Sequence, residues 1–211
     1  EPLEDDRKLL QANVAMALGD NATASKILTP IAGPRGTDLY ARFNLGVAMI
    51  RSGDVAHGTN VLDDLGRLTM PDEESRALRD KANVALGFAA MKDGRPMLAR
   101  DYLQRVRLQG IQANAALLGF GWAADAVGNP KQALVPWLEL AGRDPSDPSV
   151  LEAQLAVPYA YAELHADAQA LQRYEKAGVI SRTSLSLLNI GQAAIIAIGA
   201  TLMMAMAAGG V

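Results

Sequence analysis

Residues 114–148 read NAALLGFGWAADAVGNPKQALVPWLELAGRDPSDP, and this stretch decides the fold. It is rich in Ala and Leu, which favour helix, and Gly128-Asn129 interrupts it once. Gly ends a helix because it takes the left-handed conformation without a Cβ penalty, and Asn caps the start of the next one. Pro145 closes the stretch, since a helix cannot continue through it. The stretch therefore predicts two helices joined by a tight turn.

The same pattern recurs along the chain. Its other copies include VAMALGDNATASKIL (14–28), VAMIRSGDVAHGTNVL (47–62) and FAAMKDGRPMLARDYL (88–103). The turns fall at Gly19, Gly53, Gly94, Gly128 and His165, at intervals of about 34 to 41 residues. After each turn a small residue precedes a large apolar one by four positions. These pairs are Ala24–Leu28, Gly58–Leu62, Ala99–Leu103, Ala133–Trp137 and Ala170–Tyr174.

Two further features predict how each hairpin is built. Gly46, Gly87 and Gly121 lie at matching places in the first helices, where a close helix crossing leaves almost no room for a side chain. The second helices are expected to start with help from polar residues after the turn. These residues are Asp20, Asp54 and Asn129.

Residues 4–177 resemble the tetratricopeptide-repeat (TPR) family. The best-matching repeat carries, in the family's order, Phe120, Gly121, Gly128, Ala133, Trp137, Leu140 and Pro145. The last repeat departs from the pattern, with His165 where Gly is usual and Pro158 inside its first helix. The resemblance implies an all-α chain, an α-solenoid of about five TPR-like helical hairpins.

Such repeats imply a protein-interaction scaffold that holds a peptide or partner protein on the concave face, which the first helices line. Projecting the repeat onto that face selects Tyr40, Phe43, Asn44, Val47, Lys81, Val84, Phe88, Met91, Leu118, Trp122, Asp125, Leu155 and Tyr159. Phe88, Trp122 and Tyr159 occupy equivalent places, which indicates either an aromatic ladder for a partner or rings that fill the gap between hairpins. Asn44 and Lys81 alone do not make the carboxylate clamp that some TPR domains use.

Other classes of function find little in the sequence. With 20 Lys and Arg against 23 Asp and Glu, the chain has a net charge of −3 and no basic block for a nucleic acid. The absence of Cys excludes thiolate chemistry and Cys-ligated metals. His57 and His165 fall in turns, and no phosphate-loop pattern is present. We therefore expect no catalytic residue, cofactor or metal, and no enzyme.

The C-terminal segment is of a different kind, because residues 183–211 hold no charged residue or His. This run exceeds the ~20 residues that a membrane-spanning helix needs. Residues 174–211 resemble the fifth transmembrane helix of half-size ABC exporters of the mitochondrial iron–sulfur and heavy-metal-tolerance group. The matching residues are Ser184, Leu185, Leu187, Leu188, Asn189, Gly191 and Gln192. The resemblance implies that Asn189 and Gln192 would contact glutathione or its conjugates, although one helix builds no cavity.

The sequence is therefore divided into a repeat domain, residues 1–177, and a hydrophobic helix, residues 178–211. Three explanations are open for the junction between the repeat domain and the hydrophobic helix. The protein is a repeat protein with a tail anchor, a split permease, or a fusion of two coding regions, and we favour the fusion. The alternative function is accordingly a fragment of an ABC-type exporter fused to a repeat domain. Lys and Arg precede the hydrophobic run and none follows it, which predicts membrane association with a cytoplasmic repeat domain. If the tail is not native, the cell envelope or periplasm is the alternative.

Overall fold

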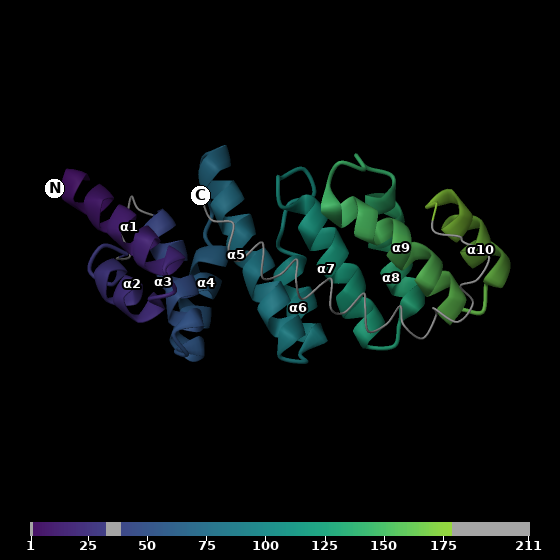
Figure 1. The fold of residues 1–211 in the computed structure, drawn as a ribbon, viewed down its shortest axis with the longest axis horizontal. Coiled ribbons are helices and arrows are strands. Elements are labelled where there is room, and N and C mark those ends of the chain that lie inside the picture. The colour runs from purple at the N-terminus through teal and green to yellow at the C-terminus, as the bar shows by residue number, and fades with distance from the viewer. Residues whose placement is uncertain (1, 33–38, 179–211) are drawn as a thin grey trace. The chain divides into compact units, whose positions relative to one another are not determined.

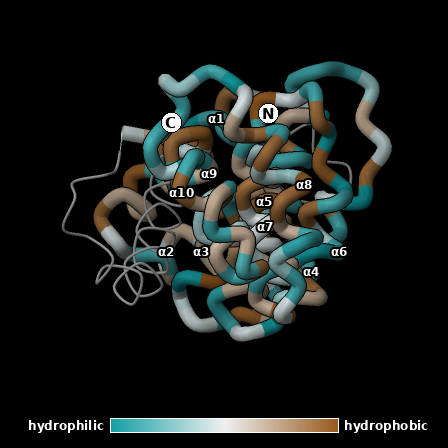
Figure 2. The backbone as a smooth tube through the Cα atoms, turned by 90° about the vertical axis from the view of Figure 1, so that its right-hand side faces the viewer, coloured by the Kyte–Doolittle hydropathy of each residue, from teal (hydrophilic) through white to brown (hydrophobic). Residues whose placement is uncertain are grey.

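A computed structural model describes residues 2–32 and 39–178, which are all-helical, with ten α-helices and no strand among them (Figure 1). The helices are α1 Pro2–Ala17, α2 Asn21–Leu28, α3 Leu39–Arg51, α4 Val55–Gly66, α5 Glu73–Lys92, α6 Pro96–Leu103, α7 Ala113–Ala126, α8 Pro130–Ala141, α9 Pro148–Glu163 and α10 Asp167–Lys176. Hydrophobic residues are interspersed with polar ones along these helices (Figure 2), as in helices that bury one side. The predicted all-α class is confirmed for this part of the chain.

Successive helices pair as hairpins, and the turns between their helices lie where the sequence predicts them. The first four turns have a left-handed glycine, with φ of 82° at Gly19, 98° at Gly53, 69° at Gly94 and 74° at Gly128. His165 takes the fifth position with φ of 56°, although it has a Cβ. A left-handed residue other than Gly costs about 1–2 kcal/mol, so the fifth turn keeps the geometry of the repeat against the preference of its residue.

The predicted helix starts are confirmed at two of three positions. Asp20 accepts a hydrogen bond from the backbone N–H of Thr23 at 3.1 Å, and Asn129 caps α8 through Gln132 at the same distance. Asp54 makes no such cap. Its carboxylate instead lies 2.8 Å from Nδ1 of His57, one turn into α4, so the side chain is engaged away from the backbone.

The glycines of the first helices lie at close helix crossings, as predicted, and the structure shows that they face the large residues of the second helices. The pairs are Gly46 with Leu62, Gly87 with Leu103, and Gly121 with Trp137. A Cβ on Gly46 would lie 2.6 Å from Cγ of Leu62, and a Cβ on Gly87 would lie 2.5 Å from Cγ of Leu103. Real Cβ atoms do not approach other carbon atoms this closely. Each of these three hairpins is therefore closed by a glycine without a side chain and one large apolar side chain.

The chain divides into two compact units, and the boundary after Leu86 falls inside α5. In unit 1 (up to Leu86) the first two hairpins bury a core of small and branched side chains. Its buried members are Ala12, Ala24, Leu28, Ala41, Leu45 and Ala48. Unit 2 (from Gly87) contains the cluster around Trp137, which is described below with the candidate surface.

Unit 1 also buries polar groups between α4 and α5. Asn83 is fully buried, and its Nδ2 donates to the carbonyl oxygens of Gly66 at 2.9 Å and Arg79 at 3.2 Å. A Cβ on Gly66 would lie 2.7 Å from Oδ1 of Asn83. Asp80 is also fully buried and is 2.8 Å from the guanidinium of Arg79. The amide of Asn83 thus satisfies a carbonyl at the end of α4, where the helix leaves its last carbonyls without internal partners.

The predicted hydrophobic helix, residues 178–211, lies outside the described residues except for Gly178. Within residues 2–32 and 39–178, no helix combines the length and the apolar character that crossing a bilayer requires. The domain boundary proposed at this point therefore stays a prediction.

Candidate partner-binding surface

Trp122 of α7 connects the first helices of two successive hairpins in unit 2. Its Nε1 donates to Oε1 of Glu152 in α9 at 2.8 Å. Its ring lies 6.3 Å from the ring of Tyr159, two turns further along α9, and 4.7 Å from the ring of Trp137 in α8. One turn beyond Trp122, Asp125 accepts a hydrogen bond from the hydroxyl of Tyr159 at 3.4 Å. We call these four residues, Trp122, Asp125, Glu152 and Tyr159, the α7–α9 seam.

Both carboxylates of the seam lie in an environment that disfavours their charge. Burial raises the pKa of Glu152, and the hydrogen bond from Trp122 offsets only part of this effect. Burial also raises the pKa of Asp125, the nearby charge of Glu163 raises it further, and the Tyr159 hydroxyl lowers it. Among the described residues neither carboxylate pairs with Lys, Arg or His, so neutral donors alone oppose the cost of burying them.

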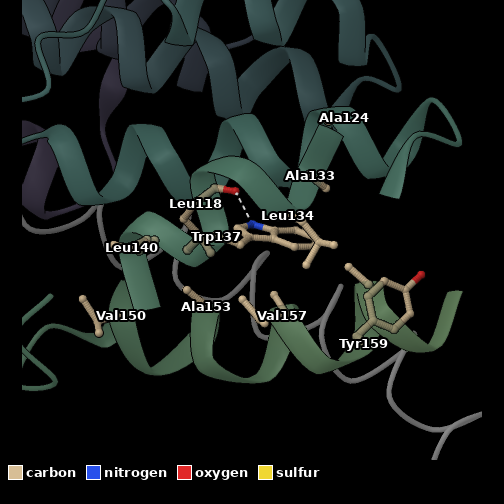
Figure 3. Close-up of a cluster of buried hydrophobic side chains, with 12 residues drawn as sticks. Leu118, Ala124, Ala133, Leu134, Trp137, Leu140, Val150, Ala153, Val157 and Tyr159 are labelled. Carbon is tan, nitrogen blue, oxygen red and sulfur yellow. Dashed lines mark hydrogen bonds between the residues drawn. The ribbon is translucent and has the colours of Figure 1, made fainter. Parts of the chain in front are cut away.

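The seam rests on a close-packed layer formed by α7, α8 and α9. Trp137 is fully buried, and its Nε1 donates to the carbonyl oxygen of Leu118 at 3.2 Å (Figure 3). The indole of Trp137 lies directly against Gly121. Tyr159 is at the edge of this cluster in Figure 3 and retains 8% exposure, whereas Trp122 is partly exposed. The two tryptophans therefore differ, because one fills the core and the other lies between the core and the surface.

A polar network fixes the starts of α7 and α9 relative to each other. Asp147 caps α9 by accepting from the N–H of Ser149 at 2.7 Å, and its other carboxylate oxygen accepts from Nδ2 of Asn114 at 2.7 Å. Arg143 donates to Oδ1 of Asn114 at 2.8 Å and lies 3.2 Å from Glu139. These hydrogen bonds at the N-terminal ends of α7 and α9 therefore help to hold the register that brings Trp122 to Glu152.

In unit 1 the predicted surface residues interact mainly with one another and with neighbouring helices. The Lys81 ammonium lies 5.1 Å from the ring centre of Phe43, a cation–π geometry. Tyr40 donates through its hydroxyl to Glu74 at 2.8 Å, and this bond raises the pKa of the phenol. Asn44 donates to Asn13 at 2.7 Å. These contacts connect α3 to α1 and to α5.

The remaining predicted residues differ in how much surface they offer a partner. Val47, Phe88, Met91 and Leu155 are partly exposed. Leu118 is 2% exposed and belongs to the core cluster with Trp137, which leaves almost none of its side chain for a partner. Phe43 is 8% exposed and Val84 4% exposed, so these two side chains offer a partner less surface than the repeat projection predicts.

Glu152 is a residue of the candidate surface that the repeat pattern does not predict. This residue lies seven positions before Tyr159, the spacing that returns to the same side of a helix, so the helical projection of α9 contains the signal. A Glu in the second turn of a helix is ordinarily a solvated residue, and the pattern gives no reason to bury it. Only the register of α7 against α9 brings its carboxylate to Trp122.

Other site chemistries find no support in the described part of the chain. No three Asp, Glu or His side chains there lie close enough to hold a metal ion. His57 and His165 are both exposed. Asn189 and Gln192, the two residues selected by the exporter resemblance, lie outside the described residues.

Comparison with known proteins identifies helical-repeat structures. The chain is similar to the MamA RS-1 ArsTM double mutant at 16% identity and a TM-score of 0.63, over 86% of this chain and 97% of that one. MamA AMB-1 is similar at 19% identity and a TM-score of 0.58, over 87% of this chain and 98% of that one. A putative kinesin light chain of Podosopora anserina with nearly identical TPR-like repeats is similar at 16% identity and a TM-score of 0.59, over 88% of this chain and 99% of that one.

No family model matches the sequence, and no curated protein matches it. The resemblance of residues 174–211 to an ABC exporter helix receives no support from these structures, which are TPR-like repeat proteins. At this level of identity the likeness concerns the fold. The described residues therefore form a TPR-like helical-repeat structure.

Proposed function

We propose that this protein is an interaction scaffold that binds an extended segment of a partner protein along the α7–α9 seam. Successive first helices form one continuous face in helical-repeat folds, and this face is where such folds hold peptides. The repeat architecture supports the proposal that the protein is an interaction scaffold. The side chains of the seam support the proposal that the partner binds there.

The observation that carries the proposal is the composition of the seam. Trp and Tyr are the side chains that most often anchor protein interfaces, because they offer a large apolar ring and a polar group together. Trp122 is only partly covered by its own chain, and it meets Tyr159 across the two hairpins at 6.3 Å. Two carboxylates border the rings. A partner segment would meet apolar surface and hydrogen-bond acceptors within one strip.

The proposal involves binding without a reaction. The seam contains no histidine or nucleophile beside a base, and its hydrogen bonds join carboxylates to an indole and a phenol. These groups recognise and orient a ligand. Residues 183–211 lie outside the described residues, so the membrane association predicted from them stays a prediction.

The proposal can be tested by selecting peptides from a displayed random library on the full chain in mild detergent. The affinity of the selected peptides is then measured by fluorescence anisotropy for Trp122→Ala and Asp125→Lys. We expect each change to weaken binding by ~2 kcal/mol or more, as at interface anchors. Asp101→Lys is the control, because Asp101 is an exposed residue of the second helix α6. Binders that tolerate both seam variants would place the interaction elsewhere and refute the proposal.

Trp137→Ala separates a loss of binding from a loss of folding. Trp137 is fully buried in the layer beneath the seam, so its truncation should cost ~3–5 kcal/mol of stability. Trp122 is partly exposed, so we expect Trp122→Ala to cost less stability than Trp137→Ala. For each unit of stability lost, Trp122→Ala should lose more affinity for the peptide. Equal destabilisation by the two changes, with binding lost only in proportion, would show that Trp122 acts through packing alone.

A further inference from the structure

The carboxylates along the α7–α9 seam form a row. Glu152 and Glu163 lie on the same side of α9, because eleven residues complete slightly more than three full helical turns. At a rise of about 1.5 Å per residue they are separated by roughly 16 Å along the helix. Asp125 of α7 lies beside the C-terminal part of this row, since it accepts a hydrogen bond from the hydroxyl of Tyr159. Burial, and then the nearby charge of Glu163, raise the pKa of Asp125. Trp122 and Tyr159 lie between Glu152 and Glu163 in this row.

Glu152 is the most enclosed member of the row. The residue is 8% exposed, and one of its carboxylate oxygens, Oε1, accepts from Trp122. Among the described residues the structure shows no hydrogen bond or ion pair to the second oxygen, Oε2. Oε2 is not fully enclosed, so a cation that approaches from solvent can reach it and offset the cost of burying the rest of the carboxylate.

The form of the row distinguishes between the two kinds of cation. A metal ion needs several ligands around one point, and no such group of acidic side chains exists in the described residues. The carboxylates instead follow a line, with aromatic rings between them. Lys and Arg suit both features, because they pair with carboxylates and lie favourably over the faces of Trp and Tyr.

Unit 1 shows this type of contact formed within the chain. There Lys81 lies 5.1 Å from the centre of the Phe43 ring. In unit 2, Arg100 lies 5.2 Å from the ring centre of Phe120. No Lys or Arg of the described chain takes this place over Trp122, so the acceptor surface there is left to a ligand.

We propose that the seam binds an extended protein segment that carries two or three Lys or Arg residues. This inference rests on the proposed scaffold function and specifies the chemistry of the partner. An extended chain rises about 3.3 Å per residue, so the row from Glu152 to Glu163 matches roughly five residues. Basic side chains at alternate positions would lie on one side of that segment and face the carboxylates.

The test measures the affinity of the full chain for three labelled peptides of equal length by fluorescence anisotropy. The probes are Ac-ARARARA-amide and its counterparts with Gln or Glu in place of Arg. We expect the Arg peptide to bind, with affinity that falls as salt rises, and the Gln and Glu peptides to bind at least about tenfold more weakly. Spermine is included as a competitor, because it presents several cations without a peptide chain.

The variant Asp125→Asn/Glu152→Gln keeps the shapes of the seam and its acceptor oxygens while removing two charges. We expect it to weaken binding of the Arg peptide at least about tenfold. The matched control Asp101→Asn/Glu175→Gln removes the same two charges from exposed positions on α6 and α10 and should bind as the parent protein does.

Each result decides the inference. Equal binding of the three peptides, equal weakening in the control, no binding of the Arg peptide, or displacement by spermine at the same concentration as the peptide would overturn it. The library selection described above then separates the two proposals. If selected neutral or acidic peptides are lost on Trp122→Ala, the scaffold function stands and only the basic partner is wrong. If no selected peptide depends on the seam, both proposals fail.

Discussion

Gly121→Ala should destabilise the protein although it changes a single hydrogen atom into a methyl group. The new Cβ would fall on the indole of Trp137, which is fully buried and cannot move toward solvent. The indole is also held by its hydrogen bond to the carbonyl oxygen of Leu118 at 3.2 Å. Either α7 and α8 must separate, or Trp137 must leave its position and break that bond.

The magnitude follows from three contributions. Overpacking a core costs about 1–3 kcal/mol. A lost or stretched hydrogen bond of the indole adds about 1 kcal/mol. Replacing Gly by Ala inside a helix returns about 1 kcal/mol of intrinsic helix propensity. The net expectation is a loss of about 2 kcal/mol in the free energy of unfolding, which lowers the melting temperature of a chain of this size by roughly 4–8 °C.

Urea denaturation followed by tryptophan fluorescence provides the assay, because Trp137 reports directly on this layer. Gly142→Ala is the control, since the nearest atom to its Cβ would be a carbonyl oxygen at 3.6 Å and its φ is −87°, a value open to Ala. We expect the control to change stability by no more than about 0.5 kcal/mol. A Gly121→Ala protein as stable as the control would show that the close crossing of α7 and α8 is not needed.

Three further predictions follow from individual side chains. The raised pKa of Glu152 means that the folded state keeps a proton after the unfolded chain has lost it, so stability falls as pH rises above the ordinary value near 4.5. Glu152→Gln should therefore stabilise the protein by about 1 kcal/mol at pH 7, and urea titrations should show that this gain disappears near pH 4. A gain in stability that does not depend on pH would contradict this reasoning. His165→Gly should gain about 1 kcal/mol in thermal melts because φ is 56° there, whereas His165→Ala should not. Asp147→Ala should cost about 1–2 kcal/mol, since α9 loses its cap and Asn114 loses an acceptor, and an unchanged melt would refute that role.

The hairpins could be predicted from sequence because each depends on local rules. Gly128 and its equivalents need a left-handed backbone, and a glycine such as Gly87 opposite a large residue such as Leu103 needs a close crossing. Both features are encoded by residues within one repeat. Asp54 shows the limit of the local rule, because its carboxylate meets His57 instead of capping α4.

Contacts between hairpins could not be predicted in the same way. The bonds Tyr40–Glu74, Asn44–Asn13 and Trp122–Glu152 each join residues about thirty positions apart. They depend on the rotation and register of one hairpin against the next. The repeat projection identified Trp122 correctly as a residue of the first helix and gave no information on its partner.

The aromatic ladder was open to two interpretations, and the structure gives Trp122 a part in each. Its ring packs at 4.7 Å against the buried Trp137, which is a structural role, and it remains partly exposed. The choice of Glu152 as the acceptor for its Nε1 is not explained by packing, because a neutral Gln would accept the same bond at 2.8 Å without a buried charge. Burying most of this carboxylate raises the cost of folding, and a cation that binds its solvent-accessible oxygen would offset that cost, which is the reason to expect Lys or Arg in the partner.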